Sequence, residues 1–211
     1  MKKIIVATTN KNKVERIKNL LKEQDYEILS LKEAGLENIP EPEEKANTPV
    51  KIAIEKAMHY VDYVPEGTII LTQDDTIKLE GVSEEDDPKL SIKGPVREKY
   101  GEFTDELGAK YYTELAKKYG GSIPITFNYG HAIAIQKEED RNTINIAGSS
   151  SRIEARLVDR IYKLETVPGY FLSAIIEVNK DGKWVPHNSL SEDELIKLDN
   201  DLYNSIMGIL P

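Results

Sequence analysis

The stretch IIVATTNKNKVERIKNLL, residues 4–21, decides the fold of this 211-residue chain. Its apolar start has no polar alternation, which predicts a strand over residues 3–8 that is buried on both faces, as in a parallel sheet. After a polar turn, apolar residues recur at helical spacing from Val14 to Leu21, so one stripe of a helix faces the sheet. With a second strand at 26–31, the order strand, helix, strand predicts an α/β unit with a right-handed crossover.

The polar turn between the first strand and the helix predicts an anion site. Asn10 is the expected N-cap, and Lys11 and Lys13 lie in the first turn. The helix dipole opposes positive charge there by about 0.3–1 kcal/mol. A phosphate held by the free amides and Lys13 would make the positive charge of Lys13 favourable at this position. The alternative is that both lysines are simply solvated.

Composition excludes several classes of function. The net charge of −9 and pI near 5.0 argue against a grip on long nucleic acid, which needs a basic face. The absence of cysteine excludes disulfides, thiolate metal sites and cysteine nucleophiles. No apolar run approaches the roughly 18 residues of a membrane helix, so we expect a soluble, cytoplasmic protein.

The remaining patterns predict a mixed α/β protein whose second half is rich in strands. The last helix begins after Ser191, where Ser191 and Glu194 fit a capping box. Residues 32–49 are expected to form a loop because they contain one glycine and three prolines. The other elements expected are helices at 50–62 and 104–119 and strands at 123–136, 143–158 and 173–178.

An acidic pair interrupts the apolar segment TIILTQDDTIKLEG (68–81), which predicts a strand that stops at the pair and a second short strand after it. Two adjacent carboxylates are costly to hold together unless a cation or proton neutralises them. Asp74 and Asp75 reach one ion only where the strand ends or bends, because neighbours in a regular strand point to opposite faces. A Mg²⁺ shared with phosphate oxygens would neutralise the two charges and could be reached by both carboxylates. An exposed Asp-Asp turn is the alternative.

The first motif resembles the N-terminal signature of the inosine triphosphate pyrophosphatases, the ITPase-like house-cleaning nucleoside triphosphate pyrophosphatases. That signature runs Ala-Thr-x-Asn-x-Gly-Lys, and the chain has Ala-Thr-Thr-Asn at 7–10 followed by Lys13. The family's loop binds triphosphate, so the resemblance implies phosphate contacts for Thr8, Asn10 and Lys13. Asn12 stands in place of the glycine, and Arg16 in place of the usual glutamate.

Two further segments are similar to the family. Asp-Asp-Thr from Asp74 is similar to the segment that supports metal binding and water activation, which implies Asp75 as the catalytic carboxylate and Asp74 and Asp75 as metal ligands. Lys56 with its alanine resembles the end of the family's second helix, which implies a phosphate contact. The family's metal-binding glutamate falls five residues earlier in that alignment, where this chain has Lys51. If the loop alignment shifts, three nearby carboxylates could take its place: Glu43, Glu44 and Glu55.

The base-recognition side matches only in outline. Gly169-Tyr170 fits the family's Gly-Phe-Gly-Tyr-Asp-Pro loop in part, but Phe171 takes the place of the aspartate. The terminal helix contains neither the histidine nor the arginine of the family's Ser-His-Arg. Either the base preference is altered, or the protein binds a nucleotide without turning it over.

The resemblance implies a single ITPase-like domain over 1–211, an α/β fold with an elongated mixed β-sheet flanked by helices, and two lobes with a central cleft. It implies Mg²⁺-dependent hydrolysis (with Mn²⁺ as the alternative ion) of a nucleoside triphosphate to monophosphate and pyrophosphate, by a homodimer that uses neither long nucleic acid nor membrane. The alternatives are a nucleotide-binding module without catalysis and a structural protein that keeps only the fold.

Overall fold

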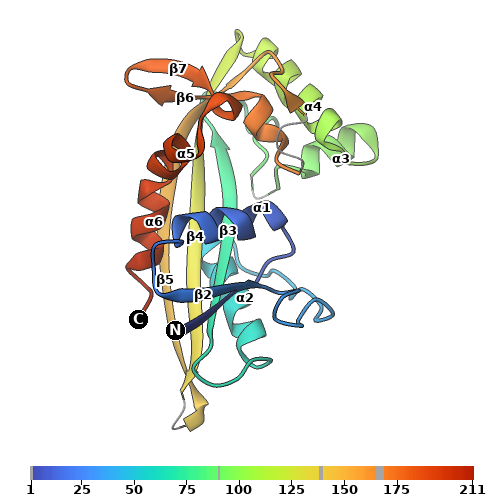
Figure 1. The fold of residues 1–211 in the computed structure, drawn as a ribbon. Helices are drawn as coiled ribbons and strands as arrows, with labels where there is room; N and C mark the ends of the chain where they lie inside the picture. Colours follow the sequence, from blue (N-terminus) through green and yellow to red (C-terminus); the bar gives the residue numbers. More distant parts are fainter. Residues whose placement is uncertain (1, 90, 138–139, 165–168) are drawn as a thin grey trace. The chain divides into compact units, whose positions relative to one another are not determined.

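The computed structural model describes residues 2–89, 91–137, 140–164 and 169–211. Within these residues the strands form one mixed seven-stranded sheet in the order β2-β1-β3-β4-β5-β6-β7 (Figure 1). The elements are β1 Lys2–Val6, α1 Lys11–Leu20, β2 Tyr26–Ser30, α2 Pro49–Val61, β3 Ile69–Leu79, α3 Gly94–Tyr100, α4 Asp105–Lys118, β4 Ser122–Lys137, β5 Asp140–Val158, η2 Phe171–Ala174, β6 Ile176–Lys180, β7 Lys183–Pro186, η3 His187–Ser189, α5 Glu192–Leu198 and α6 Asn200–Met207.

The chain forms two compact units. Unit 1 contains Met1–Asp75, Tyr129–Ser151 and Leu198–Pro211, and unit 2 contains Thr76–Asn128 and Arg152–Lys197. The predicted α/β fold with a mixed sheet is confirmed. The assignment of 1–211 to a single domain stays a prediction.

The N-terminal α/β unit is confirmed. β1 pairs in parallel with β2 on one side and β3 on the other, so that Ile5 lies between Leu29 and Ile70. The chain therefore moves from β1 to β2 in one direction and from β2 past β1 to β3 in the other. Right-handed crossovers then place α1 and α2 on opposite faces of these strands (Figure 1).

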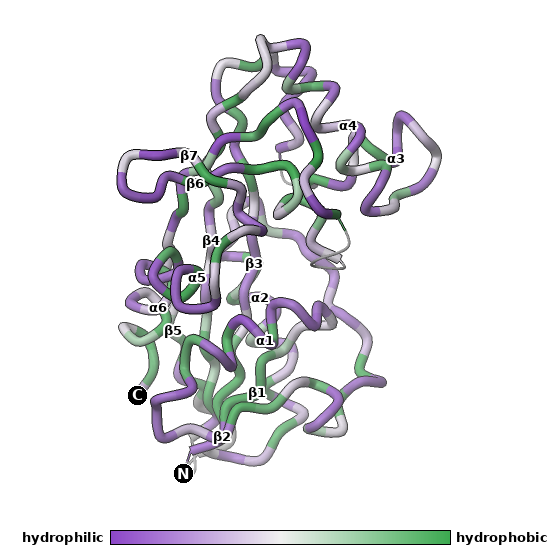
Figure 2. The backbone as a smooth tube through the Cα atoms, turned by 45° about the horizontal axis from the view of Figure 1, so that its top comes forward, coloured by the Kyte–Doolittle hydropathy of each residue, from purple (hydrophilic) through white to green (hydrophobic). Residues whose placement is uncertain are grey.

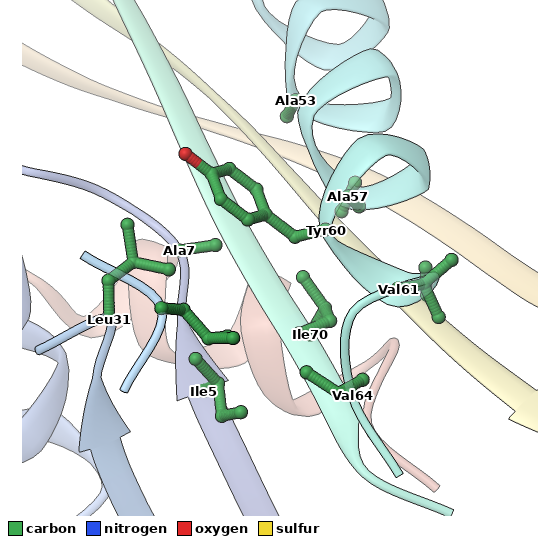
Figure 3. Packing of buried hydrophobic residues seen from close by; sticks show 12 residues of the cluster. Ile5, Ala7, Leu31, Ala53, Ala57, Tyr60, Val61, Val64 and Ile70 are labelled. Carbon is green, nitrogen blue, oxygen red and sulfur yellow. The ribbon is translucent and has the colours of Figure 1, made fainter. Parts of the chain in front are cut away.

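Each face of β1 is covered by one helix, which explains its continuous apolar run. Ile5 and Ala7 join a buried cluster with Ala53, Ala57 and Ile70 on the α2 side (Figure 3). Ile4 and Val6 alternate to the other face, where the stripe Val14, Ile17 and Leu20 of α1 is also buried. Figure 2 shows β1 as a hydrophobic segment.

Two sequence predictions are wrong in detail, and one helix is absent from the prediction. β3 is not interrupted at the acidic pair but continues through Asp74 and Asp75 to Leu79. Residues 94–100, which contain Gly94 and Pro95, form helix α3. The C-terminal helix has the predicted capping box, since the Ser191 N–H donates to Glu194 (2.8 Å), but it is divided into α5 and α6. Among the described residues, no helix has the length and apolarity needed to cross a bilayer.

Candidate functional site

The loop between β1 and α1 forms the predicted N-cap. The Asn10 carboxamide oxygen accepts from the backbone N–H groups of Asn12 (3.0 Å) and Lys13 (3.4 Å). The Thr8 hydroxyl oxygen accepts from the N–H of Asn10 (3.2 Å), which fixes the turn before the helix. Thr8 and Asn10 thus shape the loop, while Lys13 carries a positive charge to the helix N-terminus, where anions bind.

The acidic pair is divided between the two faces of β3. Asp74 forms an ion pair with Lys56 of α2 (2.9 Å), and Asp75 forms one with Lys13 of α1. Alternation along a regular strand requires this division, because α1 and α2 cover opposite faces. The structure thus brings Lys13 to Asp75 and Lys56 to Asp74. That both carboxylates hold one metal ion stays a prediction.

The Lys56 ammonium lies between two carboxylates. Besides Asp74 it contacts Glu44 (2.6 Å), which belongs to the loop before α2. Burial by itself would lower the pKa of Lys56, but Glu44 and Asp74 outweigh burial and raise it. Burial raises the pKa of Asp74, whereas Lys56 and then Lys13 oppose that rise. Because Lys13 acts on Asp74 as well as on Asp75, the two ion pairs are electrostatically coupled.

A short acidic segment, residues 40–46, brings Glu44 to this place. The Glu55 carboxylate of α2 accepts from the N–H groups of Lys45 (3.1 Å) and Ala46 (3.2 Å). At the other end of the segment, the Thr9 hydroxyl donates to Glu41 (2.7 Å). The sequence alone offers Glu44 as one of three alternatives and gives no reason to select it. The only signal was the acidic run in EPEE, which is also common on solvated loops.

Glu44 and Asp74 are the pair that best fits a divalent cation. Both present hard oxygen donors, and together they already enclose one positive charge, that of Lys56. Within the described residues, no group of three or more His, Cys, Asp or Glu side chains is placed to hold a metal. Mg²⁺ is commonly bound by only one or two carboxylates together with phosphate oxygens. Two carboxylates are therefore compatible with a Mg²⁺ whose other ligands come from a phosphate group or water.

Arg16 of α1 anchors a second charged contact on the same helix. Its guanidinium donates to both carboxylate oxygens of Asp199 (Nε to Oδ2, 2.6 Å) and lies over the Tyr129 ring, 4.8 Å from the centroid. Asp199 is 7% exposed and Tyr129 is 4% exposed. Arg16, which differs from the family's usual glutamate, thus has an acidic partner near the C-terminus of the chain.

His131 lies fully buried beside these charges. Its Nε2 lies 3.2 Å from the Ser151 hydroxyl, and its Nδ1 has no hydrogen-bond partner among the described residues. Burial first, and then the positive charges of Arg16 and Lys13, lower its pKa to about 4. The imidazole is therefore neutral at neutral pH.

His131 predicts a loss of stability on mild acidification. Between its unfolded pKa of about 6.5 and its folded value of about 4, the unfolded chain binds a proton that the folded chain does not, so stability falls as pH falls. From about pH 7 to about pH 5 we expect this residue to contribute a loss of about 2 kcal/mol, measured by denaturant unfolding. His131→Gln should reduce the pH slope, and His59→Gln should retain it. An unchanged slope in His131→Gln contradicts the prediction.

Two residues that depart from the family's pattern, Phe171 and Lys51, behave as packing or surface residues. Phe171 is 4% exposed in unit 2, where its ring packs against Phe103 and Tyr112 (centroids 5.6 and 5.9 Å away). Lys51 is exposed in the first turn of α2, and its backbone N–H donates to the Thr48 hydroxyl (3.4 Å). Neither position provides the carboxylate that the resemblance associates with it.

Comparison with known proteins finds one family that is similar to the N-terminal part of the chain. Residues 4–86, which run from within β1 to beyond the end of β3, match the model of the Ham1 family. Two curated relatives are each named dITP/XTP pyrophosphatase. The one from Caldanaerobacter subterraneus subsp. tengcongensis is 42% identical over 76 residues, which is 36% of this chain and 36% of that protein. The one from Malacoplasma penetrans is 29% identical over 140 residues, 64% of this chain and 69% of that protein.

Solved structures share the fold over almost the full length. A HAM1 protein from Coxiella burnetii aligns with a TM-score of 0.61 at 19% identity, covering 99% of this chain and 100% of that one. The Staphylococcus aureus Ham1 protein aligns with a TM-score of 0.62 at 17% identity, covering 98% and 99%. The N-terminal part of the chain is therefore similar to the Ham1 family, and the described chain shares the fold of Ham1 structures, in agreement with the resemblance of the sequence motifs.

Proposed function

We propose that the protein is a nucleoside triphosphate pyrophosphatase, which hydrolyses a nucleoside triphosphate to the monophosphate and pyrophosphate. The observation that carries the proposal is the ion pair of Lys13 with Asp75 at the N-terminus of α1. It joins an anion-binding helix start to a carboxylate suited to act as a base. The names of the two curated relatives support the same activity.

In this proposal each candidate residue of unit 1 has a separate role in binding or catalysis. Asp75 accepts a proton from water as the water oxygen bonds to the α-phosphorus, and the bond from that phosphorus to the bridging oxygen breaks, so that pyrophosphate leaves. Lys13 and Lys56 bind phosphate oxygens, and the cap formed by Thr8 and Asn10 fixes the start of the helix that carries Lys13. Each lysine exchanges a carboxylate partner for phosphate when substrate binds.

We also propose that the reaction depends on Mg²⁺ or Mn²⁺. Glu44 and Asp74 would hold the ion, because both are hard oxygen donors that already enclose a positive charge. When bound, such an ion neutralises phosphate charge and polarises the phosphorus–oxygen bonds. The proposal also includes a homodimer in the cytoplasm that acts on free nucleotides, without long nucleic acid or a membrane as partner.

The second candidate is a nucleotide-binding module without catalysis. The exposed Lys51 favours it, because the family places a metal-binding glutamate there in the alignment on Lys56. Binding in this case relies on the lysines and the helix start. It should therefore be indifferent to chelators.

One experiment separates the two candidates. We expect pyrophosphate release from at least one member of a panel of purine and pyrimidine ribo- and deoxyribonucleoside triphosphates, including ITP, dITP and XTP, in the presence of Mg²⁺. Excess EDTA should abolish release, and added Mg²⁺ or Mn²⁺ should restore it. Thermal stabilisation by a nucleotide in EDTA, with no release under any condition, would instead establish the binding module. No release and no stabilisation by any member refutes both.

A further inference from the structure

The N-terminal half of α1 presents two cations, one turn apart, to two different parts of unit 1. Lys13 and Arg16 are three residues apart and so lie on the same side of the helix. Lys13 pairs with Asp75 of β3, and Arg16 pairs with Asp199 at the start of α6. The charged side of α1 is therefore held at both of these positions, while its apolar stripe is buried.

Asp199 is an N-cap residue that does not cap its helix. It is the N-cap residue of α6, where an aspartate ordinarily accepts from the helix's own N–H groups, yet its side chain makes no capping hydrogen bond. Its carboxylate instead accepts from Arg16, 183 residues earlier in the chain. A local stabilising contact has thus been replaced by a long-range one. Such a replacement often marks a functional constraint.

The pair is well placed to fix the orientation of α1. Two donors of one planar guanidinium meet the two oxygens of one carboxylate, a geometry that restricts rotation more than a single contact does. The Tyr129 ring beneath supports the guanidinium plane. Asp199, at 7% exposure, has little access to water as a substitute partner. Breaking the pair would leave a buried, uncompensated charge.

We propose that Asp199 and Arg16 are positioning residues that hold α1 in the orientation in which Lys13 meets the phosphates. This inference rests on the proposed function for its substrate and goes beyond it in assigning these two residues. Neither residue bonds to the phosphates. Each acts through the placement of the helix that carries Lys13.

The sign of the effect of Asp199→Asn separates positioning from simple charge attraction. If Arg16 only attracted phosphate through space, removal of the Asp199 charge would strengthen phosphate binding. Positioning predicts the reverse, with KM for the nucleotide and Kd for inorganic tripolyphosphate both raised about tenfold and kcat changed less. Arg16→Lys keeps the charge but loses the bidentate contact, so it should weaken binding in the same direction.

A matched control lies on the same helix. Lys18 of α1 pairs with Glu33 (2.9 Å) outside the proposed site, so Glu33→Gln also removes a carboxylate from an α1 ion pair and should leave KM unchanged. A melting temperature for each variant ensures that binding is measured on folded protein. Tripolyphosphate binding by Asp199→Asn that equals or exceeds that of the wild type overturns the inference.

Amide hydrogen exchange on the ligand-free protein tests the positioning itself. We expect faster exchange along α1 in Asp199→Asn than in Glu33→Gln, whose exchange should match the wild type. If the wild type binds neither nucleotide nor tripolyphosphate, the proposed function fails. The assigned role of holding α1 is then decided by exchange alone, and equal exchange in the two variants overturns it.

Discussion

The Asp75→Asn variant is expected to lose about 10²–10⁴-fold in kcat while remaining folded. The amide has nearly the same shape as the carboxylate but cannot accept the proton of water. Because Asp75 is also the ion-pair partner of Lys13, its neutralisation removes a competitor for that lysine. Nucleotide binding should therefore be retained or strengthened, so the loss falls on kcat and not on KM.

Asp25→Asn provides the control, because it makes the same chemical change at an exposed position of unit 1. Steady-state kinetics and a binding titration with the best substrate of the panel, together with a melting curve, are sufficient. If Asp75→Asn keeps the wild-type kcat, Asp75 is not the base. A fall in kcat that is matched by loss of folding carries no support for the assignment.

The Gly130→Ala variant is expected to lose much of its stability through a backbone clash. A Cβ at Gly130 in β4 would lie 2.2 Å from both the carbonyl carbon of Pro49 and the nitrogen of Val50. These are backbone atoms at the start of α2, so no side-chain rotation relieves the clash. Since overpacking alone commonly costs 1–3 kcal/mol, we expect about 3 kcal/mol or more, a fall of roughly 6–12 °C in melting temperature.

Gly148→Ala in β5 is a matched control, because it meets the same helix through side chains. Its Cβ would lie 3.1 Å from Cγ1 of Val50 and 3.3 Å from Cδ1 of Ile54. These atoms can move by a few tenths of an ångström, so the cost should be small. Thermal and denaturant unfolding of the two variants measures the difference, and similar stabilities for both would contradict the close approach at Gly130.

The sequence was sufficient for the parts of the fold in which local pattern and tertiary environment agree. The four consecutive apolar residues Ile4–Ala7 predict a strand that is covered on both faces, and all four are buried in the structure. Asn10 caps α1 and Ser191 caps α5 because capping is decided within a few residues of chain. Such contacts need no knowledge of distant segments.

The errors arise where a contact with a distant segment determines the secondary structure, or where a residue type is common in two kinds of structure. Asp74 and Asp75 predict an interruption because adjacent charges oppose burial, but lysines from α1 and α2 neutralise one on each face, and the strand continues. No helix is predicted at 94–100, although proline is favoured in the first turn of a helix, as Pro95 is in α3.

The candidate site could be predicted only in part for the same reason. The motifs identify Lys13, Lys56 and the acidic pair, since these lie in short recognisable segments. Glu44 depends on how a proline-rich loop returns along α2, and the Arg16–Asp199 pair joins residues 183 positions apart. No local pattern encodes such distances.

The burial of Phe171 has a consequence for any redesign of this position. Its ring is enclosed by Phe103 and Tyr112, so an aspartate at this position would place an uncompensated charge among aromatic side chains, at a cost of several kcal/mol. A single substitution of Phe171 by aspartate should therefore destabilise unit 2, whereas substitutions that also change Phe103 and Tyr112 could accommodate the charge.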